Sequence, residues 1–304
     1  MKCVVLLNEK AGLDSTPRAR VETISRLAAQ ARIDATIHSV APEQLQTTLD
    51  RVLADSKVET LFIGGGDGTV RTAAAALVNR PLSLGVLPLG TLNHFAKDLR
   101  IPPQLEDAFT TLSQGITRTV DVASVNAHIF INNCSLGSYA EAVRQRNLLL
   151  RGKRMRKGWA MLRASVRTFL RFRRMRLRLT LPPDSPQSIA TPLLVVANNR
   201  YTGHVLAPNL RERLDSGELC LYTAHVHRHL PALRLAWQAL TRKLDAADAL
   251  SVRPSKSAVI ETQQRSAPPV AVDGEIVDFT FPLRFHSHPK SLRVLVPRET
   301  TDDT

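Results

Sequence analysis

The sequence predicts an N-terminal α/β domain with a parallel sheet, followed by a C-terminal β-sandwich domain. In the first third of the 304 residues, short apolar runs alternate with segments of helical periodicity, as in a parallel sheet covered by helices. From about residue 122 onward the signals become short apolar runs separated by turn residues, which is typical of a sandwich. The length is sufficient for two domains, each with its own core.

The N-terminal domain is predicted from four apolar runs and the helical segments between them. Strands are expected over residues 3–7, 35–40, 58–63 and 83–87. Helices are expected over residues 17–31, 42–55 and 70–79, with a short one ending near Asp98. Because strands and helices alternate, the strands should run parallel and end at one edge of the sheet.

The turn after the third strand is rich in glycine, and residues 61–71 read Leu-Phe-Ile-Gly-Gly-Gly-Asp-Gly-Thr-Val-Arg. Glycine lets backbone N–H groups converge on a phosphate, and the following helix directs its positive end at the same anion. Thr69 is placed to cap that helix. Asp67 would repel a phosphate unless a cation or a sugar hydroxyl lay between them, so we expect it to contact ribose or the metal of a metal-nucleotide. The alternative is an ordinary tight turn in which Asp67 is a local cap.

Two familiar phosphate-binding motifs do not match this turn. The Walker loop requires Gly-Lys-Ser/Thr after its spacer, whereas Thr69 is followed by Val70. The dinucleotide fingerprint requires its third glycine three residues after the second, and it normally follows the first strand of the sheet rather than the third.

A second turn of the same kind follows the fourth strand, where residues 88–91 read Pro-Leu-Gly-Thr. In a doubly wound sheet it should lie beside the first glycine turn, at the carboxyl edge where such folds bind ligands. Two adjacent turns can hold one nucleotide between them. The alternative is that Asn93 only caps the next helix and that Lys97 is merely exposed.

The second domain is predicted over residues 122–297, after a nucleotide-binding domain of residues 1–121 and before a tail of residues 298–304. Its expected strands cover residues 129–132, 176–181, 191–197, 218–223, 258–262, 269–272, 276–281 and 292–296. The run 270–272 ends in Asp273-Gly274-Glu275, where the glycine permits a sharp turn that exposes both carboxylates. A bare turn with two acidic residues is the alternative.

Three segments together resemble the diacylglycerol kinase catalytic-domain family, which includes bacterial soluble lipid kinases and sphingosine kinases. They are residues 64–69 (Gly-Gly-Gly-Asp-Gly-Thr), residues 88–97 (Pro-Leu-Gly-Thr-Leu-Asn-His-Phe-Ala-Lys) and residues 272–275 (Val-Asp-Gly-Glu). The resemblance implies a first domain like those of phosphofructokinase and NAD kinase, and an enzyme that uses ATP and Mg²⁺ to phosphorylate diacylglycerol or a similar lipid alcohol. It implies that the nucleotide contacts are Asn8, Gly64, Gly65, Gly66, Asp67, Gly68, Thr69, Gly90, Thr91 and Asn93.

The catalytic carboxylates are expected in the third segment. A carboxylate near the attacking hydroxyl can take its proton late in phosphoryl transfer, so we assign Asp273 as general base and Glu275 as its orienting or metal-binding partner. By resemblance, Asp121 links the two lobes. The segment 214–219 resembles a turn that can hold a structural cation, with Asp215 as a ligand.

Departures from the family pattern keep two other functions open. Glu9 replaces the usual proline, and His94 occupies a position that the family mostly fills with Asp. A catalytically weak nucleotide- or lipid-binding regulatory protein is therefore one alternative. NAD kinase shares the glycine loop, but Asn132-Asn133 stand where its usual Asn-Glu pair would be expected.

The net charge of +14 is concentrated in one segment, because residues 144–179 contain 14 Lys or Arg and no Asp or Glu. Aromatic and aliphatic residues are interleaved with these cations, as in a basic amphipathic helix facing anionic lipid headgroups. We expect the stretch from Arg144 to Arg178 to bind an anionic membrane surface. A solvated helix packed on its own core is the alternative, and nucleic acid is disfavoured because no recognised binding module accompanies the charge.

No stretch approaches the roughly 20 apolar residues that span a bilayer, and the apolar N-terminus is too short for a signal peptide. We therefore expect a cytoplasmic protein that associates peripherally with membranes. Cys3, Cys134 and Cys220 are scattered in apolar contexts and should be buried, reduced thiols.

Overall fold

The computed structural model describes residues 2–12, 15–137, 140–141, 174–204, 207–211, 213–224, 250–264 and 266–298. The chain forms two compact units. The N-terminal unit comprises Met1–Val122 and Pro289–Thr304, and the C-terminal unit comprises Ala123–His288.

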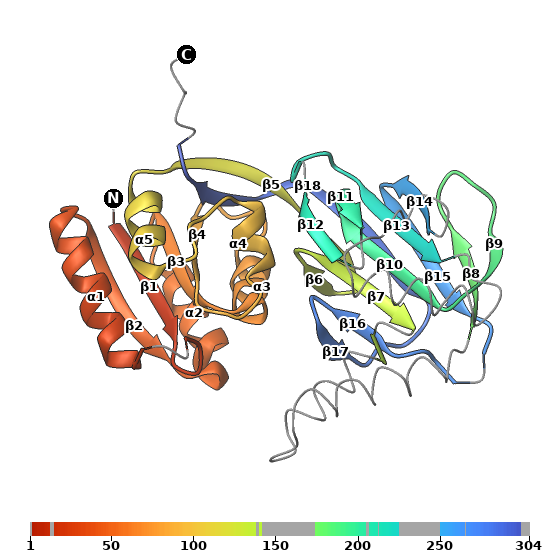
Figure 1. Ribbon diagram of the computed structural model, residues 1–304, viewed down its shortest axis with the longest axis horizontal. Helices are drawn as coiled ribbons and strands as arrows, with labels where there is room; N and C mark the ends of the chain where they lie inside the picture. Colours follow the sequence, from red (N-terminus) through yellow and green to blue (C-terminus); the bar gives the residue numbers. More distant parts are fainter. Residues whose placement is uncertain are drawn as a thin grey trace. The chain divides into compact units, whose positions relative to one another are not determined.

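The N-terminal unit contains a parallel sheet with the strand order β2-β1-β3-β4, as the α/β prediction required (Figure 1). Its strands are β1 (Lys2–Asn8), β2 (Asp34–Val40), β3 (Thr60–Gly65) and β4 (Ser83–Pro88). Its helices are α1 (Pro17–Gln30), α2 (Leu45–Ala54), α3 (Asp67–Leu77), α4 (His94–Asp98) and α5 (Leu105–Ser113), with a 3₁₀ turn η1 (Pro42–Gln44) before α2.

The central strands of this sheet are fully covered. Every residue of β3 and β4 is buried, as expected for central strands covered on both faces. The helix α5, which the periodicity did not predict, packs on this sheet through Phe109, whose ring centroid lies 5.1 Å from that of Phe62 on β3. The strands are therefore covered on both faces, and their carboxyl ends present turns at one edge of the sheet.

The C-terminal unit is the antiparallel β-rich domain that the sequence predicts. One sheet contains β18, β15, β8 and β9, and the other contains β14, β13, β10, β7, β16 and β17. Their bounds are β7 (Asn133–Gly137), β8 (Met175–Thr180), β9 (Gln187–Thr191), β10 (Leu193–Asn198), β13 (Leu219–Ala224), β14 (Leu250–Ser255), β15 (Ser257–Thr262), β16 (Val270–Val272), β17 (Glu275–Val277) and β18 (Leu283–Val296). A separate hairpin joins β11 (Tyr201–His204) to β12 (Ala207–Arg211).

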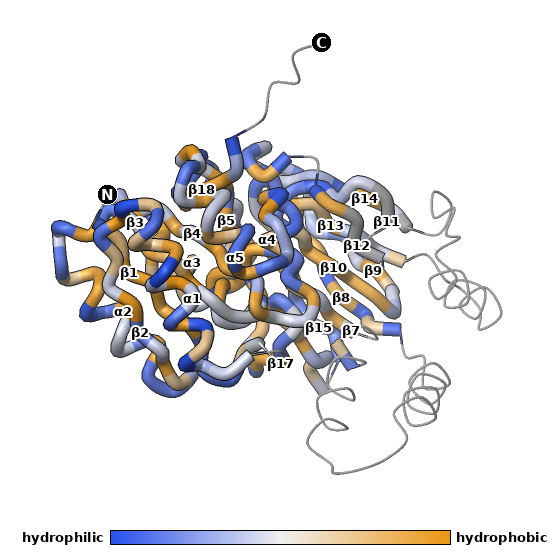
Figure 2. The backbone as a smooth tube through the Cα atoms, turned by 60° about the vertical axis from the view of Figure 1, so that its left-hand side comes forward, coloured by the Kyte–Doolittle hydropathy of each residue, from blue (hydrophilic) through white to orange (hydrophobic). Residues whose placement is uncertain are grey.

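The core of this unit lies between its two sheets. Leu177 and Ile260 from one sheet and Leu136, Val196 and Leu221 from the other belong to the same buried cluster. Figure 2 shows hydrophobic segments concentrated along the strands. The alternation of buried and exposed residues along β8 is what a strand with one covered face requires.

The chain passes between the two units twice. It leaves the N-terminal unit within β5 (Ile116–Val125), which pairs with β6 (His128–Phe130), and it returns at Pro289 within β18. Asp121 is buried beside this return, and its Oδ1 accepts the N–H of Lys290 at 2.7 Å. The sequence-based division assigned residues up to 297 to the second domain, whereas the end of β18 joins the first sheet through Val294 opposite Leu84.

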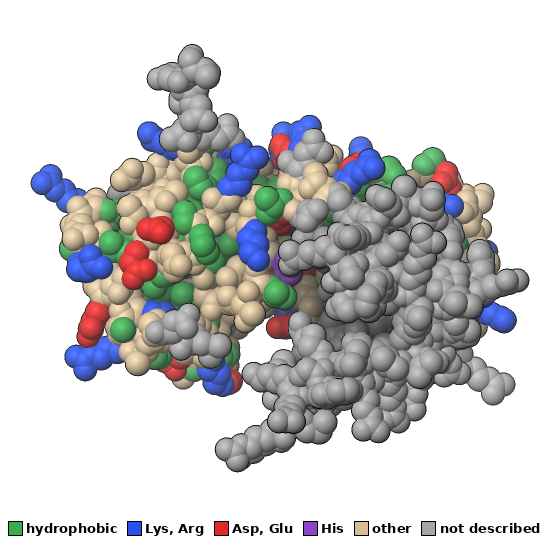
Figure 3. Space-filling view, in the orientation of Figure 1, with side chains coloured by type: hydrophobic (Ala, Val, Ile, Leu, Met, Phe, Trp, Pro, Cys, Tyr) green, Lys and Arg blue, Asp and Glu red, His purple; other side chains and the backbone are tan. Residues whose placement is uncertain are grey.

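Charge is distributed unevenly along the chain. Residues 1–122 contain 13 Lys or Arg and 13 Asp or Glu, so the net excess of +14 belongs to the remaining residues. Figure 3 shows side chains of both signs interspersed on the visible face of the N-terminal unit. In the part of the chain that the structure describes, no helix has the length and apolar character needed to cross a bilayer.

Candidate functional site

Three turns meet at the carboxyl edge of the parallel sheet. Strands β1 and β3 end in register, and β4 ends beside β3 with Pro88 opposite Gly65. The N–H of Leu89 donates to the carbonyl of Gly65 at 3.1 Å, and the N–H of Gly12 donates to the carbonyl of Leu89 at 3.0 Å. The turns that follow β1, β3 and β4 therefore form one connected surface, as the alternation of strands and helices predicted.

Glycine is required where two of these turns touch. A Cβ on Gly90 would lie 2.5 Å from the Cα of Gly66, and a Cβ on Gly65 would lie 2.5 Å from the Cβ of Thr69. Both distances are far below van der Waals contact. A side chain on Gly90 would separate the two turns, whereas one on Gly65 would displace Thr69 within the same turn, so the close approach of the two backbones depends on Gly90.

The N-terminus of α3 lacks a side-chain cap. The helix begins at Asp67, and the N-cap residue Gly66 cannot supply a side-chain acceptor. Thr69, which we expected to act as cap, instead accepts a hydrogen bond at Oγ1 from Nδ2 of Asn8, at 2.8 Å. The first N–H groups of α3 are thus available to an external acceptor, and anions favour such a position.

Asp67 connects the two glycine turns. Its Oδ1 accepts the N–H of His94 at 2.8 Å, so it satisfies the first turn of α4 rather than that of its own helix. The alternative that Asp67 is only a local cap is therefore wrong. His94 contributes to this contact through its backbone, which any residue other than proline provides.

Asn93 closes the second turn on itself. Its Oδ1 accepts the N–H of Gly90 at 2.9 Å, and its Nδ2 donates to the carbonyl of Gly90 at 2.7 Å. The residue has a positive φ of 49°, a conformation that Asn tolerates better than most residues. Its side chain is engaged in shaping the Gly90 turn, and Lys97 on the following helix is exposed.

Sequence reasoning missed Arg20, which holds the turn after β1. Its side chain is 2% exposed, and its guanidinium donates to the carbonyls of Gly12 at 3.1 Å, Ser15, Glu9 at 3.2 Å and Asn8 at 3.5 Å. Burial lowers the pKa of Arg20. The spacing of Arg20 with Ile24 and Ala28, the other buried residues of α1, was the signal that could have revealed it.

The predicted carboxylates lie in the C-terminal unit, on the hairpin between β16 and β17. Asp273 and Gly274 have φ values of 47° and 81°, as in a two-residue turn with two positive φ angles. We expected both carboxylates to be exposed, but only Glu275 is, and Asp273 is half-buried.

The carboxylate of Asp273 accepts three backbone N–H groups. Oδ2 accepts from Ile131 at 3.0 Å, and Oδ1 accepts from Asn132 at 2.9 Å and Asn133 at 3.0 Å. Three donors from consecutive residues fix the orientation of the carboxylate. Burial raises the pKa of the Cys134 thiol, and the negative charge of Asp273 raises it further.

The three cysteines are buried and free, as expected. Burial raises the pKa of Cys3 to about 11 and that of Cys220 to about 12. Such thiols stay protonated at neutral pH, so they are packing residues rather than nucleophiles.

The predicted cation site at Asp215 stays a prediction. Its Oδ1 accepts a hydrogen bond from Nε of Arg213 at 3.1 Å, and the neighbouring Ser216 donates to Oδ1 of Asn199. Across the described ranges, no three His, Cys, Asp or Glu side chains gather as a metal site would require.

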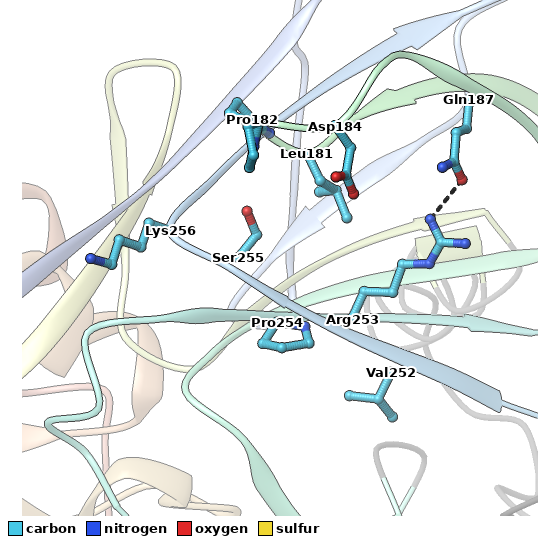
Figure 4. Close-up of a pocket in the computed structure, with 10 residues that line it drawn as sticks. Leu181, Pro182, Asp184, Gln187, Val252, Arg253, Pro254, Ser255 and Lys256 are labelled. Carbon is cyan, nitrogen blue, oxygen red and sulfur yellow. Dashed lines mark hydrogen bonds between the residues drawn. The ribbon is translucent and has the colours of Figure 1, made fainter.

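A hollow of about 560 Å³ lies elsewhere in the C-terminal unit (Figure 4). It is lined by Leu181, Pro182, Pro183, Asp184, Gln187, Val252, Arg253, Pro254, Ser255 and Lys256. The guanidinium of Arg253 points to Gln187 and donates to its Oε1 at 2.7 Å (Figure 4). None of the predicted site residues lines this hollow.

Most of the basic stretch from Arg144 lies outside the described residues. Its described end forms part of β8, where Arg176 and Arg178 are exposed. Arg178 lies 3.8 Å from Glu261 on the neighbouring strand. The stretch therefore ends in a strand, and its binding to a membrane remains a proposal.

The first unit matches a known protein family. Residues 2–125 match the family model described as diacylglycerol kinase catalytic domain, which confirms the resemblance seen in the motifs. An uncharacterized protein of Synechocystis, sll0036, is 28% identical over 250 residues, covering 79% of this chain and 55% of that protein. A protein of Yersinia enterocolitica named as a YegS-like lipid kinase is 46% identical over 86 residues, covering 26% of this chain and 29% of its own length. These alignments span about half or less of the relatives' lengths.

Solved structures share the fold of the whole chain. A diacylglycerol kinase from Bacillus anthracis has a TM-score of 0.71 at 19% identity, covering 98% of this chain and 97% of that one. An NAD kinase from Archaeoglobus fulgidus, solved in complex with ATP, is more distant, with a TM-score of 0.51 at 13% identity over 98% of this chain and 95% of that one. At these identities the likeness concerns the fold alone.

Proposed function

Since residues 2–125 match the diacylglycerol kinase catalytic domain, we propose that this protein transfers the γ-phosphoryl group of ATP to the hydroxyl of diacylglycerol or a similar lipid alcohol. The observation that carries the proposal is the meeting of three turns at the carboxyl edge of β1, β3 and β4. Two of these turns touch through glycine backbones, and one opens onto an uncapped helix N-terminus.

The chemistry of these turns suits a triphosphate. Backbone N–H groups at the start of α3 would hold a phosphate oxygen, and no Cβ at Gly66 or Gly90 obstructs the approach. Asn8 is fixed to Thr69, so the first turn would move together with the second. Asn93 would act by shaping the Gly90 turn, because its own amide is engaged there.

Asp67 is the acidic residue placed among these turns. One oxygen is held by His94, and the carboxylate is half-buried, so its negative charge is fixed beside the proposed phosphate position. Mg²⁺ bound with ATP neutralises charge on the transferring phosphoryl group. We propose that Asp67 faces this cation or the ribose hydroxyls.

Asp273 is proposed as the proton acceptor for the lipid hydroxyl. Its three N–H donors hold the carboxylate in a fixed orientation. A weak base is sufficient where the attacking hydroxyl loses its proton late in a loose transition state. Glu275 is exposed on the same hairpin and would orient the hydroxyl or contact the cation.

The basic stretch from Arg144 to Arg178 is proposed to bring the enzyme to anionic lipid. Each cation near such a surface contributes about 1 kcal/mol, and the attraction is screened by salt. Vesicle co-sedimentation should therefore increase with phosphatidylglycerol content and decrease between low and high salt. Binding that is indifferent to both would refute this part of the proposal.

The test of the reaction uses labelled ATP with Mg²⁺ and vesicles containing total lipid extracts, followed by identification of the labelled product. We expect a single class of phosphorylated lipid alcohol, and a panel of pure diacylglycerol and sphingoid base would then identify the acceptor. ATP binding without transfer to any lipid would instead select a nucleotide-binding regulatory protein. Transfer to NAD would select the NAD kinase alternative.

A further inference from the structure

The loop of residues 131–133 in the C-terminal unit lies between a carboxylate and a guanidinium. On one side its three N–H groups donate to Asp273. On the other side Arg211, at the end of β12, donates to the carbonyl of Ile131 at 2.6 Å and to Oδ1 of Asn132 at 3.1 Å. The acid and the base therefore contact the same loop from opposite sides.

A single peptide group joins the two charges. The peptide between Ile131 and Asn132 accepts a hydrogen bond from Arg211 at its carbonyl oxygen and donates its N–H to Oδ1 of Asp273 at 2.9 Å. A cation at the oxygen and an anion at the N–H polarise a peptide in the same direction, and each bond strengthens the other. The same carbonyl also accepts from Nδ2 of Asn198, at 3.1 Å.

Arg211 is deeply buried, with 4% of its surface exposed. Besides the loop, Nη1 donates to the carbonyl of Asn198 at 2.8 Å, and the N–H of Asn198 donates to the carbonyl of Asn132 at 2.9 Å. A buried guanidinium is costly to desolvate, so its donors are expected to be used wherever it lies. Its planar fork holds several donors in a fixed geometry, with Nη1 on the carbonyls of Ile131 and Asn198 and Nη2 on Oδ1 of Asn132, whereas lysine carries its three donors on a single nitrogen.

We propose that Arg211 is a positioning residue for Asp273, acting through the 131–133 loop. It fixes the carbonyl side of the loop, so that the opposite N–H groups stay directed at the Asp273 carboxylate. Without it, Asp273 would keep its charge but lose its alignment with the attacking hydroxyl. The inference rests on the proposed function, in which Asp273 accepts the proton.

The first test compares Arg211→Met and Arg211→Lys with a control, Arg253→Met, in the full-length protein. Arg253 is also on a strand of this unit and hydrogen-bonded through its guanidinium, but it is exposed and outside this network. With ATP, Mg²⁺ and dioleoylglycerol in phosphatidylglycerol vesicles, we expect Arg211→Met to lower kcat about 10- to 100-fold, the cost of a small misplacement of a catalytic group. The KM for ATP should change less than about twofold, because the proposed nucleotide turns lie in the other unit.

Combining Arg211→Met with Asp273→Asn distinguishes a positioning effect on Asp273 from a general loss of the fold. If Arg211 acts through Asp273, Arg211→Met should lower kcat little further in the Asp273→Asn background. A second loss of the same size there would overturn the proposal, as would unchanged kcat in Arg211→Met. If Arg211→Met does not fold, Arg211→Lys carries the test, and it should show an intermediate loss at a near-normal melting temperature.

The effect of Arg211 on the 131–133 loop can also be measured by NMR, without the kinase reaction. The amide protons of Ile131, Asn132 and Asn133 donate to a carboxylate and should resonate downfield in ¹⁵N-labelled protein. Arg211→Met should move them upfield, as Asp273→Asn should, whereas Arg253→Met should leave them in place. If the wild-type protein phosphorylates no lipid, the proposed function fails, but these shifts still decide whether Arg211 positions the loop. Unchanged shifts in Arg211→Met would show that Arg211 does not position it.

Discussion

The backbones of Gly66 and Gly90 are in direct contact, and the contact is asymmetric. A Cβ on Gly90 would lie 2.5 Å from the Cα of Gly66, whereas a Cβ on Gly66 would lie 3.5 Å from the Cα of Gly90. The second distance is an ordinary van der Waals contact. The two glycines are adjacent in space but 24 positions apart in the sequence. An added methyl group would clash at Gly90 but would fit at Gly66.

Gly90→Ala should destabilise the protein by about 1–3 kcal/mol, because the added methyl group forces the two turns apart. Gly66 has an ordinary φ of −86°, so Gly66→Ala should be neutral or stabilise by up to about 1 kcal/mol. The same Gly66 variant should bind ATP more weakly if its backbone approaches the phosphates. Urea denaturation and calorimetric ATP titration measure the two effects; equal stability losses in both variants would contradict the structure.

Asp67→Asn should remove the negative charge and keep the hydrogen bond from the N–H of His94. The amide oxygen can still accept the N–H of His94, so stability should change by less than about 1 kcal/mol. Loss of the charge should weaken Mg·ATP binding about 10- to 100-fold, the range for a charge-assisted contact. Asp67→Ala is the comparison, since it removes the hydrogen bond as well and should lower the melting temperature. Undiminished Mg·ATP affinity in Asp67→Asn would remove Asp67 from the proposed site.

Arg20→Met should destabilise the N-terminal unit by about 2–4 kcal/mol, because it removes a buried guanidinium and leaves several partly buried carbonyl oxygens without their donor. The turn that contains Asn8 would then lose its anchor, and ATP affinity should fall with stability. Arg26→Met on the same helix is the matched control, since Arg26 is exposed and its loss should cost less than about 0.5 kcal/mol. Similar melting temperatures for the two variants would be inconsistent with the role of Arg20.

Asp273→Asn should lower kcat by about two orders of magnitude or more while leaving ATP binding intact, because the proposed base is lost and the nucleotide turns are not touched. Glu275→Gln should have a smaller effect on kcat if Glu275 only orients its neighbour. The exposed Asp278, just after β17, provides a control in Asp278→Asn. Near-normal turnover of Asp273→Asn would end its assignment as base.

His288 should make stability dependent on pH. Burial, and then the charge of His286, lower the pKa of His288 below its usual 6.5, and its Nε2 lies 2.8 Å from Oγ of Ser124. Below about pH 6.5 the unfolded chain takes up a proton that the folded protein resists, so stability should fall as the pH decreases through the lowered pKa. Urea midpoints between pH 8 and 5 should fall less steeply for His288→Gln than for the wild type. Parallel curves would show that His288 is not responsible.

Local sequence determined the elements and the positions of the turns. Apolar runs predicted β1, β3 and β4 nearly to their ends, because buried parallel strands need continuous apolar residues. The glycines of residues 64–66 marked the end of β3, where backbones approach closely, and the Asp273-Gly274 pair marked a turn with two positive φ angles. Less marked segments were missed: α5, β5, β7, β9, β11, β12 and β14 lacked a clear period or were too short.

Tertiary structure decided what the polar residues touch. Asp67 could have capped its own helix, but the neighbouring turn brings the N–H of His94 within reach. The sequence analysis did not single out Arg20 or Arg211, yet both are buried and donate to carbonyl groups. Hydrogen bonds between segments far apart in the chain depend on distances that only the packed fold sets, so a pattern of residues shows where a site lies but not which groups hold it in place.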